Sequence, residues 1–337
     1  MTKNILITGG SGFIGSNLVR YFVHKYRAYN IYNLDSLTYA GNSSNLKDLK
    51  LIDNYHFIQE DITNTKNIIS ILHDFNITDV IHLAAESHVD NSIKNPFIFC
   101  KTNVQGTLSL LHSVESVWKK NFHDKLFIHV STDEVFGSLN KSGKFNENSK
   151  YNPQSPYSAS KAASDHFVKS YLNTYNLPVI VTNCSNNFGP YQHPEKLIPL
   201  FIHNIVNGLK LPIYGNGSNI RDWIYVDDHV SALDKILHYG QVGESYCIGG
   251  SNEISNLDLT KILISMTDKI LGNEKGHSLS LIEFVDDRPG HDFRYSINSS
   301  KIRSELKWQP LINFENGIDK TINWYLNNID WTKNLLK

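Results

Sequence analysis

A tyrosine and a lysine four positions apart are the residues of this chain that most clearly suggest chemistry. Tyr157 and Lys161 begin and end the sequence YSASK, and side chains at this spacing lie on one face of a helix. We expect the lysine ammonium to lower the pKa of the phenol, so that Tyr157 can act as a base in the oxidation of an alcohol. A lone match of this kind is more often a surface tyrosine beside a solvated lysine, so the interpretation depends on the residues that accompany it.

Two adjacent acidic residues, Asp133 and Glu134, offer a second kind of chemistry. They directly follow Ser131 and Thr132. Two carboxyl groups in unlike surroundings can act together, because a carboxylate can remove a proton while a protonated acid helps a hydroxyl group to leave as water. The structural alternative is that both residues cap or pair at the end of a strand.

A glycine-rich turn near the N-terminus predicts a dinucleotide site. The sequence TGGSGFIG places Gly9, Gly12 and Gly15 between an apolar strand and a helix, where glycines allow a tight turn and close approach of the backbone to a pyrophosphate. Asp35 ends the next strand roughly 20 residues later, where a carboxylate binds the 2'-hydroxyl of a ribose. Its charge would repel a 2'-phosphate, so we expect NAD and not NADP.

The carboxyl ends of the following strands extend this site, because open parallel sheets bind their ligands there. Asp61 follows the third strand, although it could equally be the N-cap of a helix. The residues that we expect to contact the cofactor in this part of the chain are Gly9, Gly12, Phe13, Ile14, Gly15, Asp35, Ser36, Leu37, Thr38, Asp61, Ile62, Leu83, Ala84, Ala85, Ser87, Tyr157 and Lys161.

Composition limits the other classes of function. The 337 residues carry a formal net charge of -1 and a pI near 6.9, so there is no overall positive field to attract nucleic acid or an anionic membrane. Cys100, Cys184 and Cys247 are isolated and lack metal-ligand spacing, so we expect no metal site. No apolar run approaches the roughly 18 residues of a membrane helix. A cytoplasmic location without a signal peptide is expected.

Strand-like and helix-like segments alternate through the first half of the chain. The expected strands are 4–8, 31–34, 55–59, 79–83, 126–131 and 179–184, and the expected helices are 13–26, 65–75, 96–116, 157–175, 196–207, 226–238, 256–271 and 314–327. The alternation predicts an α/β fold, a doubly wound parallel Rossmann sheet with helices on both faces. We divide the chain into an NAD-binding Rossmann domain at 1–186 and a smaller mixed α/β lobe at 187–337. The lobe is expected mainly to bind substrate, with some segments returning to the first domain.

Together these residues resemble the extended short-chain dehydrogenase/reductases and, within that family, the nucleotide-sugar 4,6-dehydratases. The sequences that carry the resemblance are LAAESHVD from residue 83, STDEVFG from 131, PQSPYSASK from 153, NCSNNFGPYQ from 183 and DRPGHD from 287. The resemblance covers nearly the whole chain. It implies an NAD-dependent hydro-lyase of deoxysugar biosynthesis, such as the rhamnose pathway. It also implies a homodimer joined through the helices at 96–116 and 157–175.

The same resemblance implies the conversion of dTDP-D-glucose to dTDP-4-dehydro-6-deoxy-D-glucose and water. After oxidation at C4 makes the C5 proton acidic, Glu134 is the base at C5 and Asp133 the acid at C6, and a hydride then returns to C6. The catalytic residues are Thr132, Asp133, Glu134, Tyr157 and Lys161. Thr102 and Asn187 are added to the cofactor contacts. The substrate contacts are Ser87, Thr132, Asn186, Lys196, Leu197, Pro212, Ile213, Tyr214, Arg221, Asn256, Asp287, Arg288 and His291.

Three cations within these blocks are candidates to hold the diphosphate of the substrate. A nearly neutral protein must supply positive charge locally, and Lys196, Arg221 and Arg288 are available. The structural alternative for each is a surface salt bridge with the acidic residue next to it.

Several alternatives remain open at this point. UDP-D-glucose is one, since a hydrophobic pocket distinguishes a methyl group by only about 1 to 3 kcal/mol. A UDP-sugar 4-epimerase or decarboxylase could share the cofactor and the Tyr157–Lys161 pair, but it has no need for the acidic pair at 133–134. An NAD-binding regulator without catalysis is a more remote possibility, because a fold does not determine a function.

Overall fold

The centre of the structure is a seven-stranded parallel sheet. The computed structural model describes residues 2–336, and the strands follow the order β10-β6-β5-β4-β1-β2-β3, with every neighbouring pair parallel. This arrangement confirms the predicted doubly wound sheet. The strands are β1 (Asn4–Thr8), β2 (Asn30–Asp35), β3 (Tyr55–Gln59), β4 (Asp79–His82), β5 (Leu126–Thr132), β6 (Val179–Cys184) and β10 (Ser245–Ile248).

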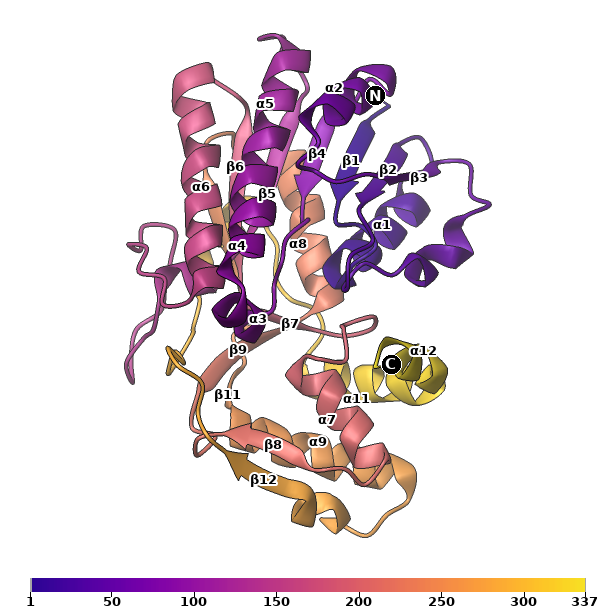
Figure 1. The fold of residues 1–337 in the computed structure, drawn as a ribbon, viewed down its shortest axis with the longest axis vertical. Coiled ribbons are helices and arrows are strands. Elements are labelled where there is room, and N and C mark those ends of the chain that lie inside the picture. The colour runs from indigo at the N-terminus through magenta and orange to yellow at the C-terminus, as the bar shows by residue number, and fades with distance from the viewer. Residues whose placement is uncertain (1, 337) are drawn as a thin grey trace.

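Helices cover both faces of this sheet (Figure 1). Side chains alternate along β1, so Ile5 and Ile7 pack on one face and Leu6 on the other. The face of Ile5 is covered by α1 (Phe13–Lys25), α8 (Val226–Tyr239) and α10 (Ser300–Leu306). The face of Leu6 is covered by α2 (Thr65–Asp74), α5 (Thr107–Trp118) and α6 (Pro156–Tyr175).

The helix expected at 96–116 is interrupted by wider turns. Residues Pro96–Phe99 form α4, Cys100–Gly106 form a π-helical segment (η2), and α5 continues from Thr107. Asn103 in this segment bonds across to Glu86 and Ser160. A Cβ atom at Gly106 would lie 2.6 Å from Ile62 Cδ1. The local geometry therefore depends on tertiary contacts, which hydrophobic spacing does not reveal.

The second half of the chain builds a smaller lobe below the sheet (Figure 1). One of its sheets joins β7 (Asn186–Phe188), β9 (Ile220–Tyr225) and β11 (Glu253–Ser255), and another joins β8 (Leu211–Tyr214) and β12 (Ile282–Val285). Phe188, Trp223 and Leu263 belong to its separate core. Its helices are α7 (Leu197–Val206), α9 (Asn256–Leu271), α11 (Phe314–Asn327) and α12 (Ile329–Leu335).

Some late segments lie with the first half of the chain. Strand β10 forms one edge of the large sheet, and α8 and α10 pack on one of its faces. The remaining short helices are η1 (Ser43–Leu49), α3 (Val89–Lys94), η3 (Asp133–Phe136) and η4 (His277–Leu281). Within residues 2–336, no helix is both long and apolar enough to cross a bilayer.

Candidate active site

The glycine-rich turn lies where the strand order reverses. Strand β1 pairs with β2 on one side and β4 on the other, and parallel sheets of this kind bind ligands at such a point. Gly9 has a φ of +71°, and a Cβ atom there would lie 2.7 Å from the backbone nitrogen of Ala84. At Gly15 a Cβ atom would lie 2.1 Å from the carbonyl oxygen of Gly9. The turn therefore requires these glycines, and Gly12 begins α1 without a side-chain cap.

Asp35 is the last residue of β2 and faces this turn. Its side chain is buried, and its carboxylate accepts hydrogen bonds from the backbone nitrogens of Ser11 (2.9 Å) and Leu37 (2.8 Å). Burial raises the pKa of Asp35, and these two bonds lower it. A carboxylate held beside a free helix N-terminus fits the ribose and pyrophosphate of a dinucleotide. Ser36 and Thr38 are exposed next to it.

The other residues predicted to bind the cofactor differ in their distance from the glycine-rich turn along the chain and in the contacts they make. Leu83, Ala84 and Ala85 follow β4 at the switch point, and Ala84 donates its backbone N–H to Thr8 Oγ1 at 3.3 Å. Asp61 accepts from the backbone of Thr63 at 2.8 Å. It is not the N-cap of α2, because Asn64 holds that position.

The side chains of Ile62 and Asn187 are buried and contact other residues of the protein interior. Ile62 is 4% exposed within the core under α2 and α5. The amide of Asn187 donates to the carbonyl oxygen of Ser185 (3.0 Å), and its oxygen lies 2.9 Å from His229 Nδ1. Thr102 is half-buried in the π-helical segment.

Tyr157 and Lys161 lie in the first turns of α6, as their spacing predicts. Ser155 and Ser158 form a capping box that starts the helix. Lys161 is 4% exposed and donates from Nζ to the carbonyl oxygen of Val130 at 2.9 Å. The helix thus fixes the ammonium against the end of β5.

The expected pKa of Tyr157 was wrong in direction. Burial raises the pKa of this phenol well above its usual value, the negative charge of Glu134 raises it further, and the Thr132 hydroxyl opposes them. Burial also lowers the pKa of Lys161, while Asp165 raises it. The spacing of Tyr157 and Lys161 in the sequence indicates the attraction between the pair but not the cost of burying it.

The acidic pair follows β5 directly. Thr132 caps the short helix η3, since its Oγ1 accepts from the backbone nitrogen of Glu134 at 3.2 Å. Asp133 is 2% exposed, and its Oδ1 accepts from the Thr132 hydroxyl at 3.4 Å. Its other oxygen, Oδ2, is buried without a hydrogen-bond partner among the described residues. An unpartnered buried carboxyl oxygen is costly, and a substrate hydroxyl group is a chemically suitable partner.

The two carboxyl groups experience different charges. Burial raises the pKa of Asp133 well above its usual value, and the charges of Glu134 and Asp222 raise it further. Burial also raises the pKa of Glu134, but Arg288, Arg221 and Lys196 lower it. Burial favours protonation of both groups, but the three cations oppose it at Glu134, whereas only Arg221 does so at Asp133.

Three cations, Lys196, Arg221 and Arg288, act electrostatically on Glu134, and Arg221 also acts on Asp133. Lys196 donates from Nζ to the carbonyl oxygen of Ser87 at 2.9 Å and lies 3.8 Å from its neighbour Glu195. Arg221 is 5% exposed, and its guanidinium stacks on the Tyr295 ring at 4.3 Å from the ring centroid.

The Arg288 side chain does not form the salt bridge with Asp287 that was its structural alternative. Its Nη1 lies 3.7 Å from Asp90 and not beside Asp287, which instead lies 2.6 Å from His291 Nδ1. Its buried Nε has no hydrogen-bond partner among the described residues. A guanidinium with an unused donor beside two other cations is suited to an anion such as a diphosphate.

The remaining predicted substrate residues come from the lobe. Tyr214 donates to Asp90 at 3.3 Å, and its ring meets that of His291 edge to face. Asn186 Oδ1 is buried and has no hydrogen-bond partner within residues 2–336. Pro212 is half-buried, Ile213 is buried in the core of the lobe, Leu197 begins α7 and Asn256 begins α9.

Several residues near the site were missed by the sequence argument. Asp222 is fully buried, and burial raises its pKa to about 6. Its Oδ2 has no hydrogen-bond partner in the part of the chain that the structure describes. Asn103 bonds to both Glu86 and Ser160, and Ser160 lies in the second turn of α6. Asp222 is adjacent in sequence to the predicted site residue Arg221, and this position could have indicated it. Nothing in the sequence around Asn103 indicates its contacts.

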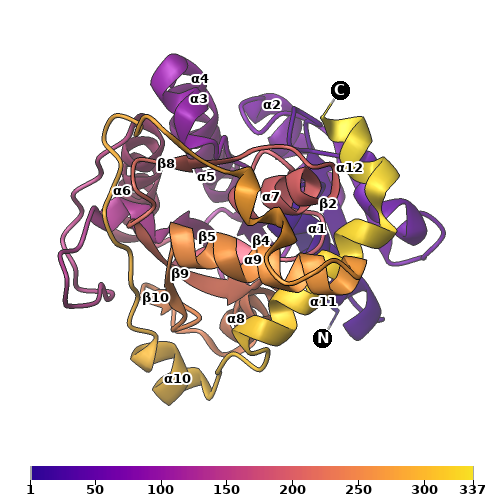
Figure 2. The same cartoon turned by 90° about the horizontal axis from the view of Figure 1, so that it is seen from below.

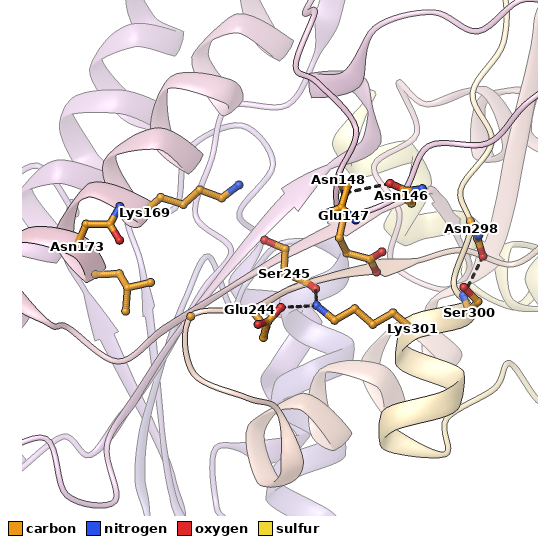
Figure 3. Close-up of a pocket in the computed structure, with 12 residues that line it drawn as sticks. Asn146, Glu147, Asn148, Lys169, Asn173, Glu244, Ser245, Asn298, Ser300 and Lys301 are labelled. Atoms are coloured by element: carbon orange, nitrogen blue, oxygen red, sulfur yellow. Dashed lines mark hydrogen bonds and ion pairs between the residues drawn. The ribbon is translucent and has the colours of Figure 1, made fainter.

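A cavity of about 570 Å³ lies apart from these side chains (Figure 3). It opens at the β10 edge of the large sheet, where Lys301 pairs with Glu244 at 2.6 Å. None of the described residues lining it is a predicted site residue. No group of three or more His, Cys, Asp or Glu side chains within residues 2–336 is arranged to hold a metal ion.

Comparisons with known proteins agree with this geometry. Residues 6–321 match the family described as GDP-mannose 4,6 dehydratase. The chain is 50% identical over 331 residues to a probable dTDP-glucose 4,6-dehydratase of Sinorhizobium fredii, covering 97% of this chain and 94% of the relative.

Solved structures show the same likeness over the whole chain. The dTDP-glucose 4,6-dehydratase of Bacillus anthracis, in complex with NAD, is 45% identical with a TM-score of 0.89, covering 99% of both chains. That of Streptomyces venezuelae, also with NAD bound, is 42% identical with a TM-score of 0.92, covering 98% of this chain and 99% of the other. The chain therefore belongs to the GDP-mannose 4,6 dehydratase family, as a homologue of the dTDP-glucose 4,6-dehydratases, which are NAD-dependent hydro-lyases.

Proposed function

We propose that the protein converts dTDP-D-glucose to dTDP-4-dehydro-6-deoxy-D-glucose and water. The observation that carries this proposal is the unlike surroundings of Asp133 and Glu134 at the end of β5. An epimerase or decarboxylase needs no acid and base at adjacent carbons, whereas loss of water across C5 and C6 needs both. The relatives named above support the nucleotide and the sugar.

The first step in this proposal is the removal of the C4 hydroxyl proton by Tyr157. When bound, NAD supplies a reversible acceptor for the hydride at the same carbon. Burial raises the pKa of Tyr157, so the phenolate in this proposal depends on nearby positive charge, which Lys161, one helical turn away and bonded to the carbonyl oxygen of Val130, and bound NAD would supply. The Thr132 hydroxyl also lowers the pKa of Tyr157. The C4 carbonyl then makes the C5 proton acidic.

Water leaves in the second step through the acidic pair. Glu134 takes the C5 proton, the bond between C6 and its oxygen breaks, and Asp133 gives its proton to the departing oxygen. In the last step C6 receives the hydride and Glu134 returns a proton to C5. The proton gained by Tyr157 balances the one lost by Asp133, so the net change is the loss of one water molecule.

Residues of both halves of the chain hold the two ligands in this proposal. Residues 1–186 would bind NAD and residues 187–337 mainly the nucleotide sugar. The proposed NAD contacts are Gly9, Gly12, Phe13, Ile14, Gly15, Asp35, Ser36, Leu37, Thr38, Asp61, Ile62, Leu83, Ala84, Ala85, Ser87, Thr102, Tyr157, Lys161 and Asn187. The proposed substrate contacts are Ser87, Thr132, Asn186, Lys196, Leu197, Pro212, Ile213, Tyr214, Arg221, Asn256, Asp287, Arg288 and His291.

The same proposal includes a cytoplasmic homodimer. Helices at 96–116 and 157–175 would form the interface, and exposed apolar side chains near them support this choice. Phe97 is 82% exposed at the start of α4, and Ile93 and Ile98 are also exposed. Sedimentation of the purified protein would reveal a mass near twice 38.4 kDa, and a monomer at micromolar concentration would exclude this interface.

Product analysis tests the proposed function directly. The protein would be incubated with dTDP-glucose and, in parallel, with UDP-glucose, and the products identified by mass spectrometry and NMR. We expect the 4-dehydro-6-deoxy sugar from dTDP-glucose. Preferred turnover of UDP-glucose would replace the nucleotide assignment, and a C4 epimer without loss of water would contradict the dehydration.

A further inference from the structure

The C-terminal helix α12 contacts a part of the chain that is distant in sequence. Both views place it beside the segment that follows β2, although it continues from the lobe helix α11 (Figures 1 and 2). The contact is made by Trp331, whose Nε1 donates to Asn45 Oδ1 at 2.9 Å, across 286 positions of sequence. Neither residue belongs to the predicted site.

Asn45 links Trp331 to the glycine-rich turn through hydrogen bonds of its side-chain amide. It is 2% exposed, and its Nδ2 donates to the carbonyl oxygen of Ser11 at 3.0 Å. An indole N–H can only donate and a carbonyl oxygen can only accept. The side-chain amide of Asn45 therefore has one orientation that satisfies both partners. The backbone of Asn45 is held as well, because the Arg20 guanidinium donates to its carbonyl oxygen at 2.7 Å.

Ser11 lies between the two parts of the dinucleotide site. Its backbone nitrogen donates to Asp35 Oδ2 at 2.9 Å, and its carbonyl oxygen also accepts from the backbone nitrogen of Asn42 at 3.1 Å. The next residue, Gly12, is the N-cap of α1. A shift of Ser11 would thus move both the carboxylate proposed for the ribose and the helix N-terminus proposed for the pyrophosphate.

We propose that Trp331 is a positioning residue for the cofactor, acting through Asn45 and Ser11 to hold the dinucleotide-binding turn. The C-terminal helix of the lobe would thereby help to retain NAD without touching it. This inference rests on the proposed binding of NAD at the turn formed by residues 9–15.

The indole N–H of Trp331 can be separated from its packing. The ring meets Trp324 at 5.1 Å and Tyr191 at 6.1 Å between centroids, edge to face in both cases. Trp331→Phe keeps an aromatic ring in this cluster but removes the donor to Asn45 together with the second ring of the indole. Trp324→Phe is the matched control, because among the described residues the Trp324 indole makes ring contacts and no hydrogen bond through Nε1.

The experiment measures how fast bound NAD exchanges for isotopically labelled NAD in the purified holoenzyme. Loss of one net hydrogen bond changes an equilibrium constant by roughly threefold to tenfold. Changes in affinity among variants appear mainly in the dissociation rate. We therefore expect Trp331→Phe to accelerate exchange by about that factor, with kcat unchanged at saturating NAD. Trp324→Phe should exchange at the parent rate even if its melting temperature falls.

A second variant tests the pathway through the amide. Asn45→Asp keeps the acceptor for Trp331 but places a carboxylate oxygen against Ser11 O, so it should also accelerate exchange, and adding Trp331→Phe to it should have little further effect. Three results would each overturn the inference: exchange at the parent rate in Trp331→Phe, equal acceleration by both tryptophan variants, or additive effects in the double variant. Parent protein that binds no NAD would overturn the proposed function as well.

Discussion

Asp133 and Glu134 are neighbours in the sequence, yet the balance of charge around their carboxyl groups differs. Negative charges at Glu134 and Asp222 raise the pKa of Asp133 and Arg221 lowers it, whereas Arg288, Arg221 and Lys196 lower the pKa of Glu134 and Asp292 raises it. Both residues lie in η3, directly after β5. This difference is what allows adjacent residues of the same chemical type to serve as acid and base.

Replacing Glu134 with Gln should separate the two halves of the reaction. The oxidation at C4 does not use this carboxylate, but removal of the C5 proton does, so the variant should form bound NADH that persists. The near-ultraviolet absorbance of reduced nicotinamide after mixing with dTDP-glucose measures this. Release of the 4-dehydro-6-deoxy product at the parent rate would show that Glu134 is not the base.

Removing the phenol oxygen with Tyr157→Phe should leave NAD binding intact and lower turnover by at least about a hundredfold, the range expected for loss of a general base. Tyr175→Phe is the matched control, because it lies in the same helix and is 41% exposed. Steady-state turnover and NAD content are the measurements. Near-normal turnover in Tyr157→Phe would remove this residue from the chemistry.

Arg288 should affect both substrate binding and the pH profile. Its charge lowers the pKa of Glu134, so Arg288→Gln should raise that pKa and move the acidic limb of kcat to higher pH, because the base must be deprotonated. Arg288→Lys keeps the charge and should leave the limb in place. Loss of charged hydrogen bonds to a phosphate should raise KM by about tenfold or more in Arg288→Gln, and by less in Arg288→Lys, which keeps a charged donor but loses the planar fork. Identical limbs in the parent and Arg288→Gln would exclude the electrostatic role.

Strand positions and the ends of strands were the features that sequence could predict. Buried parallel strands are continuous apolar runs, so the segment 126–131 and the acidic residues after it were placed correctly. The contact between Trp331 and Asn45 was not accessible, because nothing local links residues 286 positions apart. The pKa of Tyr157 was also out of reach, since it depends on the depth of burial and on how Glu134 is oriented.

A pH-dependent contact between α1 and α8 should affect stability rather than catalysis. Asp234 lies 3.1 Å from His238 Nδ1 and 2.6 Å from Lys25 Nζ. The hydrogen bond to Asp234 raises the pKa of His238, although burial opposes this. The pKa of Asp234 is lowered to about 2 because the hydrogen bonds from His238 and Lys25 outweigh its burial.

The sign of each shift gives the pH window for this contact. The contribution of His238 is present below its unfolded pKa of roughly 6.5 and is lost as pH rises through the folded value. That of Asp234 is lost only as pH falls toward about 2. We expect the free energy of unfolding of the parent, measured with urea, to fall by about 0.5 to 1 kcal/mol more between pH 5.5 and pH 8.5 than that of His238→Gln. Equal losses in the two proteins would mean that the pair contributes nothing.

The central claim is that one sugar loses a hydride at C4 and regains it at C6 within a single closed cycle. Substrate deuterated at C4 should therefore give product deuterated at C6 of the same molecule, and a mixture of labelled and unlabelled substrate should show no transfer of label between sugars. Mass spectrometry and deuterium NMR of the product make the measurement. Label lost to solvent, passed between molecules or retained at C4 would contradict the dehydratase mechanism, and retention at C4 with inverted configuration would indicate an epimerase.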